Sequence, residues 1–321
     1  MTDSFPTDSD SASTPDTRGN LSRRSLIALG GAISAGAALG AAGGAAPARA
    51  QSAPSAGWSF DRRARALADL EREASVSIGV VAAVRGERRA FRYRADERFP
   101  MCSLFKTLAA ASLVQQRGYD DVYWTTPIPY TRADIVIDSS VLGGENPPMQ
   151  ASPDLMCDAA VRASDNTAGN LLLRELGGPA AITAFAASLG ARNTRLDRWE
   201  PDLNQALPGD LRDTSTPDDI AMLYEALLLD DAAGVLASAR LREWMLRCQT
   251  SGKRMRNGLD GPYELADKTG GGSYGVVNDA GVLWRPGHPP MTIAIMTRTD
   301  RSDATRNDAV VAEATRIVVG G

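Results

Sequence analysis

Ser103 and Lys106 are the first residues whose types and spacing could support catalysis. They stand three positions apart at the start of a predicted helix, so their side chains share one helical face. A serine hydroxyl becomes a nucleophile when a nearby base takes its proton, and a desolvated lysine can be that base. The same spacing suits a helix cap followed by a surface lysine, and the motif taken alone favours that ordinary interpretation.

A second motif, Ser164-Asp165-Asn166, lies between two predicted helices. Its hydroxyl and amide could relay a proton and bind a substrate carbonyl. Because serine, aspartate and asparagine also commonly cap helices, a purely structural role remains the alternative.

A third motif, Lys268-Thr269-Gly270, ends a predicted strand and is followed by two more glycines. Glycine lets another backbone approach closely, so a substrate could pair with this strand edge. The lysine and threonine would then hold an anionic group. The alternative is a strand that simply runs into a glycine-rich turn.

Together and in this order, the three motifs resemble the serine β-lactamase and penicillin-binding protein superfamily, over residues 61–317. In the stretch 195–213, Glu200 followed by Asn204 is similar to the class A β-lactamase loop, where both residues hold a hydrolytic water. A carboxylate that activates water is what releases an acyl-enzyme ester. The chain is therefore identified as a member of the class A serine β-lactamases, which hydrolyse penicillins and cephalosporins and give antibiotic resistance.

Three rival interpretations share part of this pattern. A penicillin-binding protein or DD-peptidase has the three motifs but no reason to carry Glu200 and Asn204 at this spacing. A β-lactam sensor domain normally needs a membrane tether. An esterase on the same fold would not need the cationic groups Lys268 and Arg254.

The resemblance implies a role for each matching residue. The implied catalytic residues are Ser103, Lys106, Ser164 and Glu200. The implied substrate-binding residues are Asn166, Asn170, Asn204, Lys268, Thr269, Gly270, Gly271 and Arg254. The proton of Ser103 would pass to Lys106 or, through a water, to Glu200, and both routes stay open. Backbone N–H groups of Ser103 and Gly271 would form the oxyanion hole.

Several positions depart from the family pattern. Val277 stands where many relatives carry a carboxylate-binding arginine, and Arg254 occupies the place that other relatives use instead. We expect Arg254 to supply the missing charge. Asp138 begins the stretch that replaces a Tyr-Ser-Pro wall of the pocket. We therefore expect no aromatic stacking there and weaker binding of carboxylate-bearing substrates.

Two smaller expectations follow from the same comparison. Arg198 and Asp213 match the pair that pins the long loop by a salt bridge. The three cysteines lack the partners found in parts of the family, so we expect free, buried thiols. They are Cys102, Cys157 and Cys248.

The elements that must position these residues give an α+β fold. Helices are predicted at 61–74, 104–116, 152–162, 167–176, 179–189, 216–229, 241–247 and 303–318, and strands at 76–84, 88–95, 263–269, 275–284 and 291–299. The expected architecture is an antiparallel sheet of about five strands flanked by the terminal helices, from 58–98 and 250–321, plus an all-helical part at 99–249. The long loop between these helices is expected to be functional.

Residues 1–50 are predicted to be a leader. A polar stretch, expected to be disordered, precedes Arg23-Arg24 and a glycine- and alanine-rich run, and Ala48-Arg49-Ala50 resembles a cleavage site. This is typical of a twin-arginine signal peptide. A transmembrane anchor is the alternative, but the many glycines argue against it. The catalytic unit 51–321 would be exported folded, to the periplasm, the cell wall or the medium.

Composition limits the partners. With a net charge of −4, the 321-residue chain has no basic surplus for binding phosphates, so nucleic acid is not an expected partner. The single histidine, His288, lies in a predicted turn, which argues against a histidine metal site or a Ser-His-Asp triad. We expect no metal, no cofactor, a small-molecule β-lactam substrate, no stable membrane insertion after cleavage, and a monomer.

Overall fold

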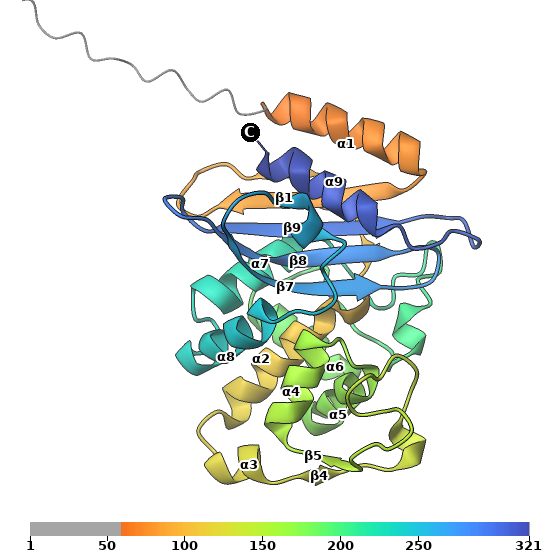
Figure 1. Ribbon diagram of the computed structural model, residues 1–321, viewed down its shortest axis with the longest axis vertical. Coiled ribbons are helices and arrows are strands. Elements are labelled where there is room, and N and C mark those ends of the chain that lie inside the picture. The colour runs from red at the N-terminus through yellow and green to blue at the C-terminus, as the bar shows by residue number, and fades with distance from the viewer. Residues whose placement is uncertain (1–58, 321) are drawn as a thin grey trace, which may run out of the picture. The chain divides into compact units, whose positions relative to one another are not determined.

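A five-stranded antiparallel sheet organises residues 59–320, the part of the chain that this computed structural model describes. Its strand order is β2-β1-β9-β8-β7, so the first hairpin joins the last three strands, as predicted (Figure 1). The strands are β1 (Ser77–Val84), β2 (Phe91–Tyr93), β7 (Glu264–Gly271), β8 (Val277–Trp284) and β9 (Met291–Arg298). Strand β7, which carries the third motif, is an edge strand and is open to pairing on one side.

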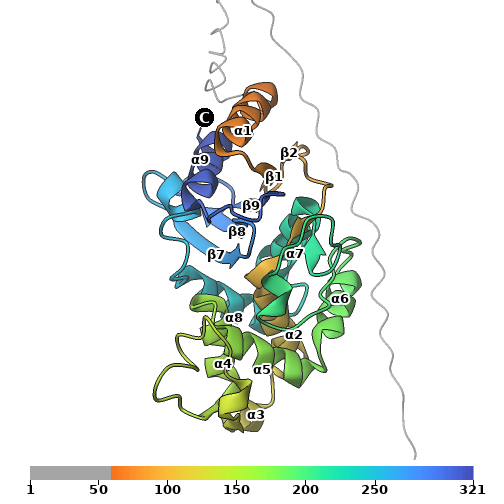
Figure 2. The same cartoon turned by 90° about the vertical axis from the view of Figure 1, so that its right-hand side faces the viewer.

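The two faces of the sheet belong to different cores. Helices α1 (Phe60–Ala74) and α9 (Asp308–Val319) cover one face, as Figure 2 shows. There Val80 and its cross-strand partner Ile295 pack with Leu67 of α1. The residues that alternate with them along the strands enter the second core, formed with the helices on the other face.

The second core is built from seven helices. They are α2 (Phe105–Arg117), α3 (Asp121–Thr125), α4 (Pro153–Arg162), α5 (Asn166–Leu176), α6 (Pro179–Ser188), α7 (Pro217–Leu229) and α8 (Val235–Leu246). Their starts follow local chemistry: Ser152 and Thr216 cap α4 and α7, each with proline at the first turn. Helix α2 is buried from Phe105 to Val114, so Ser103 and Lys106 are held in a rigid part of the molecule.

Two short strand pairs lie within 99–249, the part predicted to be all-helical, so that part also contains a little sheet. They are β3 (Phe99–Pro100) with β6 (Thr214–Ser215), and β4 (Ile128–Pro129) with β5 (Gln150–Ala151). The first pair ties the chain before the nucleophile to the end of the long loop.

The largest differences from the predicted boundaries concern three elements. Strand β2 is shorter than predicted, because only Phe91 of its three residues is buried and little apolar surface holds the rest. Helix α8 begins earlier, at Val235, after Gly234. Helix α9 begins later, because Asn307 caps it by accepting the N–H of Ala309. The segment 300–307 is therefore a loop, and it reaches the site described below.

The predicted leader, residues 1–50, lies outside the described residues. Within 59–320, no helix is both long enough and apolar enough to cross a bilayer.

Candidate active site

Ser103 lies in a single 3-10 turn, Cys102–Leu104, that leads directly into α2. Cys102 adopts a left-handed conformation with φ of 49°, which is strained for a residue with a side chain. Ser103 itself is almost fully buried. The strained turn thus presents the hydroxyl at the N-terminus of a buried helix, where negative charge is favoured.

Lys106 is the hub of the site. Its Nζ lies 3.0 Å from Ser103 Oγ, as the three-residue spacing predicted, and donates to Ser164 O at 2.8 Å and Asn166 Oδ1 at 2.7 Å. It also forms an ion pair with Glu200 Oε1 at 3.1 Å, and both side chains are fully buried. Glu200 Oε1 in turn lies 3.5 Å from Ser103 Oγ. Two groups that could take the serine proton, the Glu200 carboxylate and Lys106 in its neutral form, therefore face the same oxygen.

The second motif divides into structural and site residues. Asp165 caps α5 by accepting the N–H of Ala168 and also binds the N–H groups of Val141 and Leu142, so the helix-cap interpretation holds for this residue. Ser164 and Asn166 instead line the cavity that contains Ser103. The motif thus contacts Lys106 through the Ser164 carbonyl and the Asn166 side chain.

Lys268 on β7 brings a second buried cation to the site. Its Nζ donates to Ser164 Oγ at 2.8 Å and to Thr269 O at 2.7 Å. Burial, together with the positive charge of Lys106, lowers the pKa of Lys268 to about 7. Thr269 shares a 2.5 Å hydrogen bond with Thr250, and both line the cavity.

Two glycines after Thr269 let β7 lie against the nucleophile turn. A Cβ on Gly270 would come within 2.9 Å of Met101 O, and one on Gly272 within 2.9 Å of Cys102 Sγ. Since real Cβ atoms do not approach so closely, any side chain at these positions would push β7 away from Ser103.

Glu200 is held in place by a residue of α5 and by a residue of its own loop. The Glu200 backbone exchanges two 2.9 Å hydrogen bonds with the Asn170 side chain, and Asn204 Nδ2 donates to Glu200 Oε2 at 2.5 Å. The predicted salt bridge is present, with Arg198 Nε 2.5 Å from Asp213 Oδ2. Only one carboxylate oxygen of Glu200 is therefore held by Asn204, while the other faces Ser103 and Lys106.

Arg254 lines the cavity, but its guanidinium already has partners. It donates to Gly270 O and Asn278 O and forms a 2.6 Å ion pair with Asp308. Val277, at the position of the absent arginine, is buried in the core beneath the sheet. Carboxylate binding by Arg254 stays a prediction. In the structure, the positive charge of Arg254 is paired with Asp308.

Arg306 is a cavity residue that the sequence analysis missed. It is exposed in the 300–307 loop, donates to Gly272 O at 3.2 Å, and lies against Gly271, where an added Cβ would meet its guanidinium at 3.2 Å. No motif surrounds it, so only the tertiary fold brings this arginine to the site.

The motif residues gather at one cavity of about 430 Å³, whose lining includes Ser103, Ser164, Asn166, Thr269 and Gly271. A larger cavity of about 720 Å³ contains none of the motif residues.

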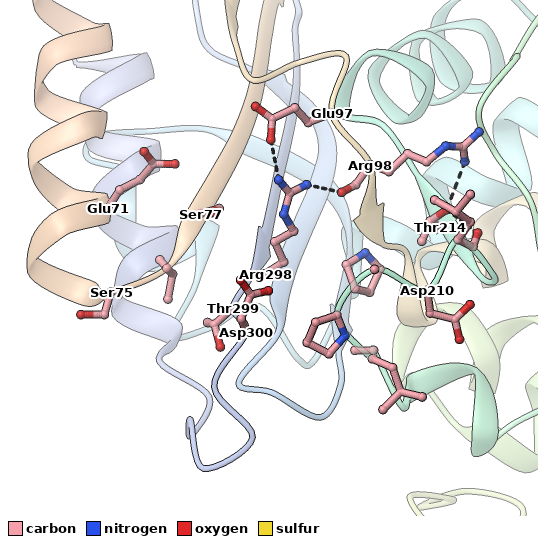
Figure 3. A pocket seen from close by; sticks show the side chains of 17 residues that line it. Glu71, Ser75, Ser77, Glu97, Arg98, Asp210, Thr214, Arg298, Thr299 and Asp300 are labelled. Atoms are coloured by element: carbon pink, nitrogen blue, oxygen red, sulfur yellow. Dashed lines mark hydrogen bonds and ion pairs between the residues drawn. The ribbon is translucent and has the colours of Figure 1, made fainter.

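The larger cavity is shown in Figure 3. There Arg298 reaches both Glu97 and the carbonyl of Arg98, while Arg98 itself bonds Thr214. Arg298 is thus paired with Glu97, and none of the motif residues lines this cavity.

The three cysteines take no part in this chemistry. All three cysteines are free thiols; Cys102 and Cys157 are buried, whereas Cys248 is half-buried rather than fully buried as predicted. Burial raises the pKa of Cys102 to about 12, so this thiol stays protonated beside Ser103. Within residues 59–320, no group of three or more acidic, histidine or cysteine side chains is placed to hold a metal ion.

Comparison with known proteins gives consistent similarities. The family model described as "Beta-lactamase enzyme family" matches residues 62–320. A curated beta-lactamase of Streptomyces albus G is 42% identical over 305 residues, covering 92% of this chain and 96% of its own. The solved structure of the beta-lactamase from Streptomyces albus G has a TM-score of 0.78 at 43% identity, covering 80% of this chain and 98% of that chain. A mutant class A beta-lactamase of the last common ancestor of Gram-negative bacteria has a TM-score of 0.76 at 42% identity, covering 80% and 97%.

Proposed function

The chain belongs to the beta-lactamase enzyme family, and from that premise we propose how it hydrolyses the β-lactam amide bond: through an ester on Ser103 that a Glu200-activated water cleaves. The observation that carries this mechanism is the buried Glu200 carboxylate, 3.5 Å from the Ser103 hydroxyl. A carboxylate in this place can hold a water against the ester, so acylation is followed by release. Hydrolysis inactivates the antibiotic and thereby confers resistance.

Acylation begins when Ser103 Oγ attacks the β-lactam carbonyl and loses its proton to Lys106, or through a water to Glu200. Both groups lie within reach, at 3.0 and 3.5 Å. The backbone N–H groups of Ser103 and Gly271 stabilise the oxyanion. When the carbon–nitrogen bond breaks, Ser164 passes a proton to the ring nitrogen and regains one from the group that took the Ser103 proton. Its contact with the Lys268 ammonium supports this relay, because the cation favours loss of the hydroxyl proton.

The substrate lies along the edge of β7. Its ring carboxylate is held by Lys268, Thr269 and Arg254, and its side-chain amide by Asn166. The open edge of β7 and the cationic groups beside it support this orientation. Asn170 and Asn204 act on Glu200 rather than on the substrate, since both bond that residue directly.

The pKa of Lys268 predicts a pH dependence for anionic substrates. Because that pKa is lowered to about 7, the ammonium is present below pH 7 and is lost above it. We expect kcat/KM for a penicillin to fall as pH rises from 7 to 9, mainly through KM, since a bound carboxylate favours the charged amine. The measurement is a pH profile of steady-state rates.

Two controls separate this effect from other titrations. Lys268→Arg should flatten the profile above pH 7, because arginine keeps its proton there. A penicillin methyl ester, which has no carboxylate, should lose less than the acid with the wild type, because only the Ser164 relay then depends on the ammonium. If the ester and the acid fall in parallel, another group is titrating.

We also propose that the enzyme works outside the cytoplasm. The support is the leader sequence alone, with its arginine pair, apolar run and small-residue cleavage site. Export by the twin-arginine route would deliver a folded monomer to the periplasm, the cell wall or the medium.

Turnover counting tests the proposed function. Residues 51–321 mixed with a chromogenic cephalosporin should hydrolyse many equivalents, and the intact-protein mass should return to that of the free enzyme when substrate is exhausted. A wild type that stops at one adduct per molecule would instead be a penicillin-binding or sensor domain.

A further inference from the structure

We infer that Asp138 makes this enzyme prefer β-lactams whose acylamino side chain carries an ammonium group. This inference rests on the proposed function and specifies its substrate class. It concerns the part of the cavity lined by Asp138, next to Asn166. The argument depends on where Asp138 lies, how firmly it is held, and which charges surround it.

Asp138 lies next to the group that orients the substrate amide. It lines the same cavity as Ser103, and its carbonyl accepts the backbone N–H of Asn166 at 3.1 Å. Since Asn166 is proposed to bind the amide of the acylamino side chain, the atoms beyond that amide must pass the Asp138 residue. The α-carbon of a penicillin side chain is the first of those atoms.

The backbone around Asp138 is held in place. Val136 N–H donates to Thr167 Oγ1 at 3.0 Å, and Ser139 Oγ accepts the Thr167 N–H at 2.9 Å. These bonds attach both flanks of Asp138 to the first turn of α5. The residue itself has φ of 59°, a left-handed conformation that aspartate and asparagine tolerate better than most residues.

The charge of Asp138 has no partner among the described residues. Its side chain is exposed and makes no hydrogen bond or ion pair within 59–320. The cationic residues Arg254 and Arg306 line the cavity beside Gly270 and Gly271. The cavity thus has a negative group next to Asn166 and positive groups next to β7, which matches a zwitterionic substrate and opposes a dianionic one.

Three penicillins that differ only at the α-carbon test the inference. Benzylpenicillin has a neutral α-carbon, ampicillin an α-ammonium and carbenicillin an α-carboxylate. In Asp138→Asn, kcat/KM for ampicillin relative to benzylpenicillin should fall about threefold, the size of one solvent-exposed charge interaction, and the carbenicillin ratio should rise by a similar factor. In wild type, about 1 M salt should lower the ampicillin ratio and raise the carbenicillin ratio, because screening weakens both the attraction and the repulsion.

Asparagine keeps the shape and the backbone conformation, and benzylpenicillin turnover shows that the variant is folded. Glu145→Gln is the matched control, since Glu145 is an exposed acid of the following loop that does not line the cavity. Ratios that change by less than about twofold in Asp138→Asn, or that change equally in Glu145→Gln, would overturn the inference. Absence of benzylpenicillin hydrolysis by wild type would instead contradict the proposed function.

Discussion

Glu200→Gln should convert the enzyme into a protein that acylates and then stalls. We expect deacylation to slow by about 10²- to 10⁴-fold, the usual contribution of a positioned general base. The amide keeps the shape and the hydrogen bonds to Asn170 but cannot take a proton from water. Intact-protein mass spectrometry after mixing with benzylpenicillin should show a persistent adduct of one substrate mass.

Asp202→Asn is the matched control for this experiment. Asp202 is an exposed carboxylate in the same loop, two residues after Glu200, and its side chain has no partner among the described residues. Its turnover should stay within about twofold of wild type, as for an ordinary surface substitution. If Glu200→Gln turns over as fast as wild type, another group activates the water and the proposed role of Glu200 is wrong.

Much of the site was predictable because its chemistry is local in sequence. Ser103 and Lys106 meet because they lie three residues apart at a helix start, and Ser164 and Asn166 flank a helix cap. The sheet was predictable for a similar reason, since five runs of β-branched and apolar residues were separated by clear turns. The predicted joining of the first hairpin and the last three strands into one sheet was confirmed in the structure.

What could not be predicted depends on contacts between distant segments. Arg306 reaches Gly271 only because α9 starts late and leaves a loop beside β7. The engagement of Arg254 by Asp308 is similar, since 54 positions separate the two residues. Patterns in one sequence carry no information about pairs of residues that lie far apart in the chain. The free energy of a charged group nevertheless depends mainly on such pairs.

A buried carboxyl pair beneath β7 makes the same point. Asp267 and Asp279 lie on paired strands and are both fully buried, and burial raises the pKa of each. Only Asp267 has an ion-pair partner, Arg256 at 2.5 Å. In sequence, Asp267 is simply the residue before the third motif. Because Asp267 is buried next to Lys268, it adds to the free-energy cost of holding charged groups inside this part of the sheet.

Lys106→Met should cause the second large loss of activity. We expect acylation to slow by about 10³-fold, because methionine fills the space but cannot accept the Ser103 proton. It also leaves Glu200 buried without its cation, which should lower the free energy of unfolding by about 3–5 kcal/mol. Stopped-flow acylation rates and denaturant unfolding measure the two effects, and Lys253→Met, an exposed lysine of the chain, controls for loss of a lysine charge.

The same experiment decides which group takes the serine proton. If Lys106 is the base, Lys106→Met should slow acylation far more than Glu200→Gln does. If Glu200 acts through a water, the order should reverse, and Glu200→Gln should slow acylation as well as deacylation. The double variant Lys106→Met/Glu200→Gln should regain part of the lost stability, since it removes the unpaired buried charge, but no activity. Acylation within about tenfold of wild type in Lys106→Met would exclude the lysine as the required base.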